Sequence, residues 1–454
     1  MIKRISISGF RGFADEQIVR FALPNGKVEG SGLSIITGAN NSGKTTIIES
    51  IRAFNNGEDP SFSEGKRNIN TDQHVRLCLT DEKNNDYVIE TIPSGGSSTK
   101  RNFRDSKEFY IVQSRRAIDF EFEKNYYDRR TYISNSMGVN YLRTPMLRNF
   151  TFEIFKIEKE RDKFDPILER ILGNDFKWYI EQKDGGYYYI KYLNSRASHS
   201  AEGIGDGIWS VFTICAALYD SPDNSTVVID EPELSVHPAV QKRLMDFFLE
   251  RSKKVQIILC THSPYFIRWH AIADGAGLIR VVKEQNDCKC YHLLDSCRND
   301  IKGLLKDLNN PHTLGIDANE IFFLEDRIIL VEGQEDVVIY NQISRDIGKK
   351  INGSFLGWGV GGSSKIPVFL TMLRELGYKK VVAIFDGDKK EEAENVRNLF
   401  EEYHIITIKE DDIRDKEERT INAKSGLTYK NGQYKQKYKD YLIDLIDEIN
   451  QSLA

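Results

Sequence analysis

Residues 33–51, LSIITGANNSGKTTIIESI, decide the fold of the first half of the chain. A short apolar run, LSIIT, precedes a glycine-rich loop, and the residues after the loop have the apolar spacing of a helix. The loop, Gly38 to Thr45, fits the pattern G-x-x-x-x-G-K-[S/T] in the strand–loop–helix context that this pattern requires. Backbone N–H groups of such a loop and of the following helix can cradle phosphate, so the stretch predicts a nucleotide site.

Two side chains of this loop have roles that follow from their chemistry. Lys44 can reach the terminal phosphates of a nucleotide, and the Thr45 hydroxyl can bind Mg²⁺. An acidic partner is then expected after a later strand, and VVIDEPELSVHP, residues 227–238, supplies it. Asp230 would hold the metal, directly or through water, and Glu231 would orient or deprotonate the attacking water. The residues expected to bind the nucleotide are Gly38, Asn40, Asn41, Ser42, Gly43, Lys44, Thr45, Thr46 and Asp230.

The composition indicates a globular protein of more than one domain. At 454 residues with 40% hydrophobic side chains, the chain can bury two or three cores. The net charge of −5 gives no overall basic signature, so any nucleic-acid contact must come from local patches. The sequence has no apolar run of about 20 residues, no signal-peptide pattern and no disulfide framework among its six cysteines. We therefore expect a soluble, cytoplasmic protein with no membrane partner.

Strands and helices alternate in two blocks along the chain. In the first block, buried strands at 225–230 and 255–261 flank a helix, which favours a parallel sheet covered on both faces. Residues 115–175 are long, charged and helical in pattern, and we interpret them as an insertion. A hairpin, FKWYIEQKDGGYYYIKYL, follows the insertion. After a polar segment at about 298–318, a second block of alternating strands and helices begins.

The second block carries acidic residues at two strand ends. Glu332 follows the apolar run RIILV, and Asp386, Gly387 and Asp388 follow VVAIF. Ligands bind at the carboxyl ends of parallel strands. Residues two apart on a strand-like path point the same way, so Asp386 and Asp388 can face one cation, with Gly387 relieving crowding. Clustered carboxylates suit Mg²⁺ or Mn²⁺, although D-G-D alone is usually a turn and E-G alone indicates nothing.

Four segments together resemble an ABC-type ATPase head of the SMC and OLD (overcoming lysogenization defect) kind. They are ISISGFRGF, ITGANNSGKTTIIESI, VVIDEPELSVHP and ILCTHSPYFI. The resemblance implies that the nucleotide is ATP, that His262 is the switch histidine that senses the γ-phosphate, and that the loop 234–238 packs at a dimer interface. Such heads bind ATP between two protomers, so the resemblance also implies a homo-oligomer, at least a dimer.

Two further contact loops of such heads are degenerate in this sequence. SAEGIGDGIWSV lies where the signature loop is expected, and Ser200, Gly203 and Gly205 are the candidates for contact with a partner's nucleotide. FYIVQSRRA lies at the position of the Q-loop, where Gln113 or Arg115 is the candidate. The choice among these residues stays open.

The second block resembles a TOPRIM domain of the OLD type. A strand-end glutamate followed by a later D-x-D is the TOPRIM pattern, and the lead-in EIFFLEDRIILVEG is similar to the OLD version. The likeness implies phosphodiester hydrolysis with two metals about 4 Å apart. It also implies a lysine near the C-terminus that stabilises transition-state charge, either Lys424 or Lys430. The metal ligands that it implies are Glu332, Asp336, Asp386 and Asp388.

The expected fold class is α/β: an ABC/SMC-like P-loop ATPase domain with a helical insertion, followed by a C-terminal TOPRIM domain of Rossmann-like architecture. The expected divisions are 1–114 for the N-terminal part of the ATPase, 115–175 for the insertion, through which dimerisation is expected, 176–297 for the rest of the ATPase, and 298–454 for the TOPRIM nuclease domain.

Two groups of residues leave alternatives. Cys288, Cys290 and His292, with Cys297 nearby, offer zinc ligands, but a hairpin that places the first three on one strand face is the better interpretation. The tail GLTYKNGQYKQKYKDYL interleaves tyrosines with lysines, which suits nucleic acid as well as it suits the solvated start of a helix.

The function expected from both sites is an ATP-binding and ATP-hydrolysing, metal-dependent DNA endonuclease of the OLD type. The expected partners are DNA, a second copy of the chain and, as for antiphage effectors of this type, a defence-system protein or a retron reverse transcriptase with its DNA. The alternatives are an ATP-gated nucleic-acid clamp without nuclease activity and an SMC-like repair ATPase, although long heptad arms are absent. The residues expected to be catalytic are Glu231, His262, Glu332, Asp386, Asp388 and Lys424.

Overall fold

The structure of the protein is a computed structural model, and its residues gather in two compact units, Met1–His292 and Leu293–Ala454. Each unit has its own parallel sheet. The residues that the structure describes are 1–55, 60–62, 66–69, 74–92, 98–104, 107–114, 150–173, 176–194, 197–200, 205–306, 315–323, 326–416 and 424–454.

A six-stranded sheet forms the centre of the first unit. Its order is β14-β13-β3-β12-β11-β7, and all neighbours are parallel except β13 and β14, which form an antiparallel hairpin. Strands β3, β11 and β12 are buried along almost their whole length, as expected of apolar strands covered on both faces. The bounds are β3 Leu33–Thr37, β7 Phe109–Val112, β11 Thr226–Asp230, β12 Gln256–Cys260, β13 Gly277–Glu284 and β14 Asp287–His292.

The first unit also contains a five-stranded antiparallel sheet, in the order β2-β1-β4-β5-β6. Strand β1 pairs on both edges, because Ile5 lies opposite Val19 on one side and Leu79 on the other. The sequence alone does not predict that these strands form a sheet of their own. The bounds are β1 Ile2–Ser8, β2 Gln17–Arg20, β4 Arg76–Asp81, β5 Asp86–Thr91 and β6 Thr99–Arg101.

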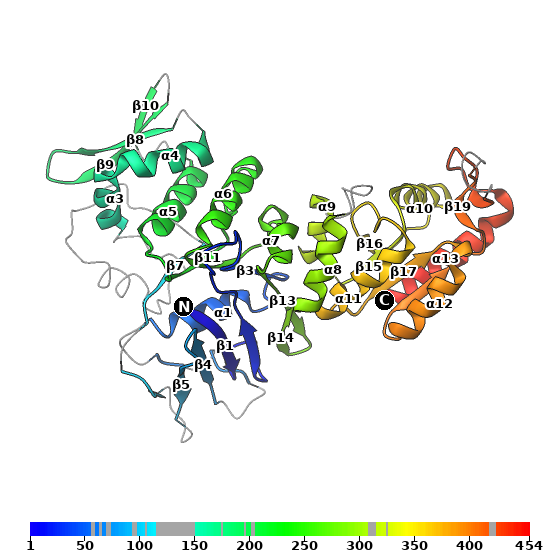
Figure 1. The fold of residues 1–454 in the computed structure, drawn as a ribbon, viewed down its shortest axis with the longest axis horizontal. Helices are drawn as coiled ribbons and strands as arrows, with labels where there is room; N and C mark the ends of the chain where they lie inside the picture. Colours follow the sequence, from blue (N-terminus) through cyan, green and yellow to red (C-terminus); the bar gives the residue numbers. More distant parts are fainter. Residues whose placement is uncertain are drawn as a thin grey trace. The chain divides into compact units, whose positions relative to one another are not determined.

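Helices cover both faces of the six-stranded sheet (Figure 1). Helix α1, Lys44–Arg52, lies on the side of the antiparallel sheet, whereas α5, Asp206–Asp220, and α6, Pro238–Arg251, lie on the other side. Helix α6 begins with a proline at its first turn, and the side chain of the preceding residue, His237, caps the Ala239 N–H. The 3₁₀ turn η2, Pro264–Phe266, and helix α7, Trp269–Ala273, follow β12.

The second half of the predicted insertion is helical. Helices α3, Phe150–Lys159, and α4, Arg161–Leu172, form where the charged helical pattern predicts them, and residues 115–149 lie outside the described part of the chain. The predicted hairpin follows as part of an antiparallel sheet of order β10-β9-β8. Phe164 of α4 lies edge-on to Trp178 and Phe212, so α4 and the hairpin pack on α5. The strand bounds are β8 Lys177–Gln182, β9 Tyr188–Asn194 and β10 Ala197–Ser200.

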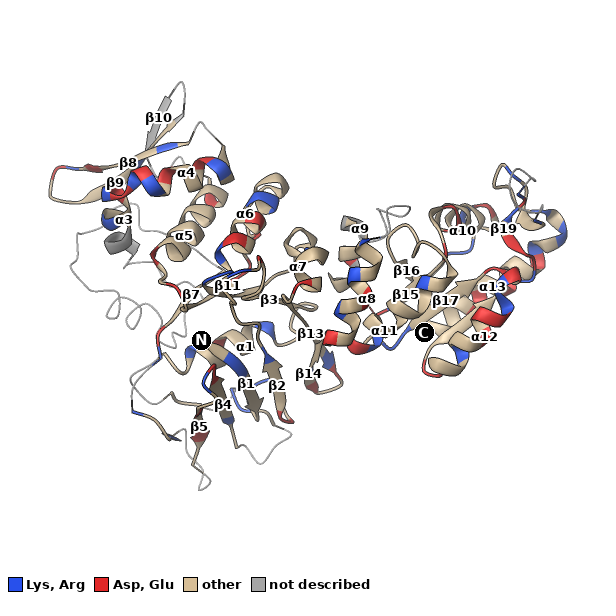
Figure 2. Ribbon diagram, viewed as in Figure 1, with Lys and Arg blue, Asp and Glu red and all other residues tan. Residues whose placement is uncertain are grey.

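A four-stranded parallel sheet of order β16-β15-β17-β18 forms the centre of the second unit. Its buried core joins Ile329 and Val382 of the strands to Leu442 and Ile446 of the C-terminal helix. Figure 2 shows charged residues along helices such as α12 and α13, whereas β15 and β17 contain none. The strand bounds are β15 Ile328–Leu330, β16 Ser354–Phe355, β17 Val381–Phe385, β18 His404–Thr407, β19 Asp412–Arg414 and β20 Gly426–Thr428; β19 and β20 form a separate parallel pair.

The helices of the second unit surround this sheet. Helices α10, α11 and α12 connect its strands, as the alternating pattern predicts. The bounds are α8 Asp295–Leu305, α9 Ile316–Glu320, η3 Ile321–Phe323, α10 Gln334–Ile347, η4 Ser363–Lys365, α11 Ile366–Glu375, η5 Gly387–Lys389, α12 Lys390–Leu399, η6 Gln436–Tyr438 and α13 Lys439–Ser452.

One segment differs from the expected secondary structure, and another forms the helix that one of its two alternatives predicts. Part of the segment 298–318, predicted as a polar connection, belongs to the helices α8 and α9, and α8 buries Cys297 and Ile301 on one face although most of its residues are polar. The tail, for which a helix start is one alternative, forms η6 and the long helix α13. Within the described ranges, no helix is both long enough and apolar enough to cross a bilayer.

Candidate functional site

The phosphate loop joins β3 to α1. Gly43 caps the helix in the left-handed region, with a φ of 112°, and Lys44 is the first helical residue. Asn40, Asn41 and Thr45 are exposed, so the start of the helix is accessible from solvent. The strand–loop–helix arrangement predicted for this stretch is therefore confirmed, and it presents the N-terminus of α1 to an anion.

Lys44 folds back onto its own loop. Its Nζ donates hydrogen bonds to the carbonyl oxygens of Gly38, at 2.9 Å, and Ala39, at 2.8 Å. Burial lowers the pKa of Lys44, and the nearby Cys260 and Asp230 oppose that lowering. The ammonium is thus placed between carbonyl oxygens and the acidic residues of the site.

Two other loop residues are buried. Thr46 is 5% exposed, and Ser42 is 2% exposed. The Ser42 hydroxyl has no hydrogen-bond partner among the described residues. Buried polar groups are normally hydrogen-bonded, so an orphaned hydroxyl in a glycine-rich loop fits a phosphate ligand.

Asp230 and Glu231 lie at the end of β11, beside the end of β12. Asp230 is in register with Cys260, and the Glu231 N–H donates to the Cys260 carbonyl oxygen at 2.8 Å. Strand β12 in turn pairs Cys260 with Ile36 of β3, the strand that leads into the phosphate loop. Glu231 has a φ of 48°, which a residue with a side chain adopts only where its surroundings hold it. The structure therefore brings the predicted acidic pair and the phosphate loop to one edge of the sheet.

His262 lies two residues beyond β12 and is partly buried. Burial lowers its pKa, the charge of Lys44 lowers it further, and Glu231 opposes both effects. The imidazole is thus near both residues, and its neutral form is favoured at neutral pH.

The signature and Q-loop candidates are only partly described. Gly205 is the N-cap residue of α5 and is exposed, and Gln113 follows β7 directly. Ser200 ends β10, and its side chain lies outside the described part, as do Gly203 and Arg115 altogether. Which of these residues contacts a nucleotide stays a prediction.

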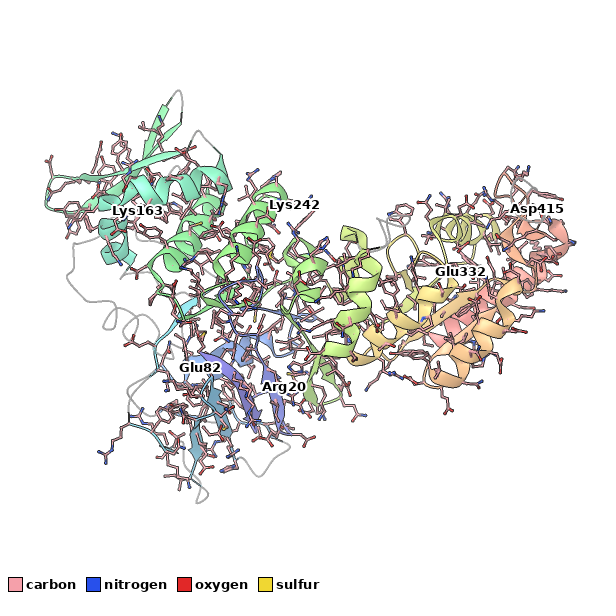
Figure 3. All side chains as sticks on the ribbon, viewed as in Figure 1. Arg20, Glu82, Lys163, Lys242, Glu332 and Asp415 are labelled. Atoms are coloured by element: carbon pink, nitrogen blue, oxygen red, sulfur yellow. The ribbon has the colours of Figure 1, made fainter. Side chains whose placement is uncertain are left out.

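In the second unit, two strand-end acids meet. Glu332, labelled in Figure 3, follows β15, and Asp386 follows the neighbouring strand β17. The Asp386 N–H donates to Glu332 Oε1 at 3.2 Å. Burial raises the pKa of both carboxyl groups, and that of Asp386 reaches about 8 because the charges of Asp412 and Glu332 add to the effect. The structure brings these two predicted residues together.

Asp336 lies in the first turn of α10 and caps that helix. Its carboxylate accepts a hydrogen bond from the Gly333 N–H at 2.8 Å. Burial raises its pKa to about 6; the bond from Gly333 opposes the rise, and the charges of Glu332 and Asp412 add to it. Asp336 is therefore close to the acidic pair, and it also fixes the turn between β15 and α10.

Asp388 does not follow the strand-like path predicted for 386–388. Residues 387–389 form the 3₁₀ turn η5, so Asp386 and Asp388 do not point the same way as they would on a strand. The cause lies at Gly387, whose N–H donates to the Glu410 carbonyl oxygen at 2.9 Å and where a Cβ would collide with that oxygen. Asp388 instead pairs with Lys424 at 2.5 Å.

The sequence prediction missed Asp412 and Lys416. Asp412 begins β19 with a side chain that is 1% exposed; it pairs with Lys416 and lies 4.0 Å from the Lys424 ammonium. A signal was present, because KEDD, residues 409–412, begins two residues after the strand that ends at Thr407. That strand, β18, is the parallel neighbour of β17, and its carboxyl end lies at the same edge of the sheet.

Of the two candidate lysines, Lys424 joins the acidic cluster. Burial opposes its charge, but the bond to Asp388 and the charge of Asp412 raise its pKa. Lys430 is exposed in the turn after β20. The tyrosines of the same tail differ as well, since Tyr438 is 5% exposed and Tyr429 is 52% exposed.

The acids do not converge as a ready-made metal site. Among the residues that the structure describes, no three His, Cys, Asp or Glu side chains have the geometry to hold a metal ion. The donor set nevertheless fits a divalent cation, because buried carboxylates that raise one another's pKa are stabilised by a positive charge.

The hairpin interpretation of the cysteine segment is confirmed. Cys288, Cys290 and His292 alternate along β14, which pairs antiparallel with β13. The His292 Nε2 accepts a hydrogen bond from the Arg20 N–H at 3.0 Å, and burial lowers its pKa to about 4. The His292 side chain is therefore hydrogen-bonded to β2. Cys297 belongs to α8 of the second unit.

The two sites define a class of protein: a P-loop ATPase domain joined to a Rossmann-like domain with acids at its strand ends. The chain belongs to the family described as AAA domain, putative AbiEii toxin, Type IV TA system, whose profile matches residues 33–268. A second profile, described as Overcoming lysogenization defect protein-like, TOPRIM domain, matches residues 323–388. The two matches confirm the α/β fold class, the ATPase and TOPRIM domains, and the resemblance to the OLD family.

Three curated proteins are similar to this chain in sequence. An OLD nuclease from Thermus scotoductus is 24% identical over an alignment that covers 76% of this chain and 75% of that protein. Septu protein PtuA from Bacillus thuringiensis is 26% identical over 54% of this chain and 70% of that protein. Endonuclease GajA from Bacillus cereus is 26% identical over 36% of this chain and 26% of that protein. Among solved structures, a Smc head domain from Pyrococcus furiosus aligns over 67% of this chain and 99% of its own, with 15% identity and a TM-score of 0.42.

Proposed function

We propose that the chain is an ATP-hydrolysing, divalent-metal-dependent DNA endonuclease of the OLD type. The observation that carries the proposal is the acidic cluster, in which the Asp386 amide binds Glu332 and the pKa of Asp386 is raised to about 8 by burial and neighbouring acids. Such a cluster is unfavourable until a cation or a proton neutralises it. The names of the relatives, an OLD nuclease and an endonuclease, support DNA cleavage as its chemistry.

At the TOPRIM site, Glu332, Asp336, Asp386 and Asp388 would hold Mg²⁺ or Mn²⁺. The bound metal supplies activation of the attacking water and stabilisation of the leaving oxygen. The Asp386 N–H orients the Glu332 carboxylate, since it donates to Oε1. Lys424 pairs with Asp388 and would supply positive charge to a phosphate as negative charge develops on it.

At the nucleotide site, Lys44 would bind the terminal phosphates of ATP, and Thr45 and Asp230 would hold Mg²⁺. Glu231 would orient or deprotonate the attacking water. His262, whose lowered pKa keeps the imidazole neutral, would donate a hydrogen bond to the γ-phosphate.

We propose further that two copies of the chain pair through the ATPase domain. The loop 234–238 presents Leu234, which is 42% exposed, and α5 begins nearby with the exposed Gly205. We propose a division into an ATPase at 1–114 and 176–292, an insertion at 115–175 and a TOPRIM domain at 293–454, with the last boundary five residues earlier than the predicted one because α8, Asp295–Leu305, lies in the second unit. The relative Septu protein PtuA supports a role in antiphage defence together with a partner, either a protein or a retron reverse transcriptase with its DNA.

A cleavage assay tests the nuclease. Supercoiled plasmid is incubated with the full chain and Mg²⁺ or Mn²⁺, with and without ATP, and nicked and linear products are measured. The Glu332→Gln variant is expected to lose cleavage, whereas Glu391→Gln, which changes an exposed acid on α12, keeps it. Equal nicking by the wild type and Glu332→Gln contradicts the proposal.

A second candidate function is an ATP-gated clamp that binds nucleic acid without cutting it. The observation that favours it is the pairing of the acids with lysines of the same chain, Asp388 with Lys424 and Asp412 with Lys416, in place of a ready-made metal geometry among the described residues. The clamp predicts DNA binding that depends on Lys44 and no cleavage with either metal. Metal-dependent nicking by the wild type excludes it.

A further inference from the structure

Glu233 lies two residues beyond the acidic pair Asp230–Glu231 and has no role in the mechanism above. Its carboxylate is partly buried, and burial raises its pKa, whereas hydrogen bonds from two neighbouring residues lower it. An acid that is withdrawn from water persists only where its oxygens are bonded. Its partners therefore show what it holds in place.

Both carboxylate oxygens of Glu233 bind the segment after β12. The Thr261 hydroxyl donates to Oε2 at 2.8 Å, and the His262 N–H donates to Oε1 at 2.6 Å. Thr261 is itself tied to β3, because its N–H donates to the Ile36 carbonyl oxygen at 3.1 Å. Glu233 thus connects the loop after β11 directly to the backbone of the switch histidine.

The hydrogen bonds continue and close a ring. The Ser263 N–H donates to Thr261 Oγ1 at 3.0 Å, and the Ser263 hydroxyl donates to Gln241 Oε1 at 2.6 Å. The Gln241 amide nitrogen donates to the Val236 carbonyl oxygen at 2.7 Å, three residues beyond Glu233. Thr261, Ser263 and Gln241 are all less than 10% exposed. A buried polar ring with its bonds satisfied is rigid, so the loop 233–236 and His262 have one fixed relative placement.

The same loop is in contact with the start of α5. At Gly207, in the first turn of that helix, a Cβ would collide with the Ser235 carbonyl oxygen. Ser235 has a φ of 62°, so the loop turns sharply at this point of contact. The loop 233–236 therefore lies between the signature-like helix and the segment that carries His262.

We propose that Glu233 is a positioning residue for ATP hydrolysis, whose carboxylate holds His262 in register with the acidic pair of β11. This inference rests on the proposed role of His262 at the γ-phosphate. Glutamate suits the position because its two oxygens accept from two donors at once, whereas glutamine has only one acceptor oxygen, so the Thr261 hydroxyl would have to change from donor to acceptor to bind its amide. The ring through Gln241 and Ser263 secures the same segment from its other side.

The test is a double-mutant cycle on ATP hydrolysis by the full chain. Glu233→Gln is expected to lower kcat by about 10- to 100-fold with KM for ATP changed by less than about 3-fold, because phosphate binding by the loop is untouched while the histidine is misplaced. In the His262→Ala background, Glu233→Gln is expected to lower kcat no further, because Glu233 acts through His262. Glu250→Gln, an exposed acid on α6, is the matched control and keeps the wild-type kcat.

A second pair of variants distinguishes positioning from loss of folding. Thr261→Ser keeps the hydroxyl and is expected to keep kcat within about 3-fold, whereas Thr261→Val removes the donor and lowers kcat without a large change in KM. Additive losses in the double mutant, a KM effect as large as the kcat effect, or an unchanged kcat in Glu233→Gln would overturn the inference. An unchanged kcat in His262→Ala overturns it too and shows that the proposed role of the histidine has failed.

Discussion

The two sites of the chain are built in opposite ways. In the nucleotide site, the cationic side chain of Lys44 lies among carbonyl oxygens and acids, and its charge is already compensated. In the TOPRIM site, buried acids from separate segments raise one another's pKa, and lysines pair with two of the acids, Asp388 and Asp412. In the first site the charges balance one another before a ligand binds, whereas the carboxylates of the second site are stabilised when a cation or a proton binds.

The largest effect is expected when the positive charge of Lys44 is removed from the nucleotide site. Lys44→Ala should lower ATP hydrolysis by about 100-fold or more, because the ammonium stabilises charge on the terminal phosphates. A steady-state ATPase assay measures the loss. Lys242→Ala is the control, since Lys242 is exposed on α6. If Lys44→Ala hydrolysed ATP at the wild-type rate, the loop that contains Lys44 would not be the site of ATP hydrolysis.

The second largest effect is expected from Lys424, the lysine that pairs with Asp388 in the TOPRIM site. Lys424→Ala should lower metal-dependent plasmid cleavage by about 10- to 100-fold, because it removes a positive charge beside Asp388. Lys430→Ala, in the exposed turn, should cleave at nearly the wild-type rate. The reverse result would make Lys430 the functional lysine and would show that proximity to the acids is not what selects it.

A smaller effect, on metal binding, is expected from Asp412, the acid that the sequence did not predict. Asp412→Asn should raise the metal concentration for half-maximal cleavage by about 10-fold, because its charge is felt by Asp386. Asp411→Asn, which changes the exposed neighbour, should leave the metal dependence unchanged. Metal titrations of the cleavage rate compare the two. Equal metal dependence of the two variants would place Asp412 outside the site.

The smallest expected effect is on stability in the absence of metal. The pKa of Asp386 is about 8 in the folded chain against an ordinary value of 3.8, so the folded state keeps a proton that the unfolded state releases between these values. Stability therefore falls as the pH rises through that window, and Asp386→Asn removes the penalty. In EDTA at pH 8 the variant should be more stable than the wild type by at least about 1–2 kcal/mol, and the difference should vanish near pH 4. Thermal melts across this pH range measure it, and a difference that does not change with pH would contradict the assignment.

What could be predicted from the sequence depends on whether a feature is contiguous. The phosphate loop is one uninterrupted segment, so Gly43, Lys44 and Thr45 are placed at the helix start by local structure alone. The acids of the second unit are far apart in sequence, yet Glu332 and Asp386 could be paired because both end parallel strands. A strand end is a local signal with a known spatial consequence.

Features that depend on contacts between distant backbones could not be predicted in this way. The turn that separates Asp386 from Asp388 arises because Gly387 packs on the Glu410 carbonyl, which nothing near 387 in the sequence reveals. The ring that joins Glu233 to Gln241 through Ser263 likewise depends on how the loop after β11 meets the end of β12. The separate antiparallel sheet of the first unit has the same cause, because strand pairing is a long-range property.

The central claim, that one chain carries two sites of different chemistry, is tested most directly by Asp386→Ala. The purified wild type and variant are compared in two assays, ATP hydrolysis and nicking of supercoiled plasmid with Mg²⁺ or Mn²⁺. We predict that the variant loses nicking and retains ATP hydrolysis within about 2-fold, because Asp386 belongs to the second unit and the phosphate loop to the first. Nicking by Asp386→Ala at the wild-type rate would contradict the account.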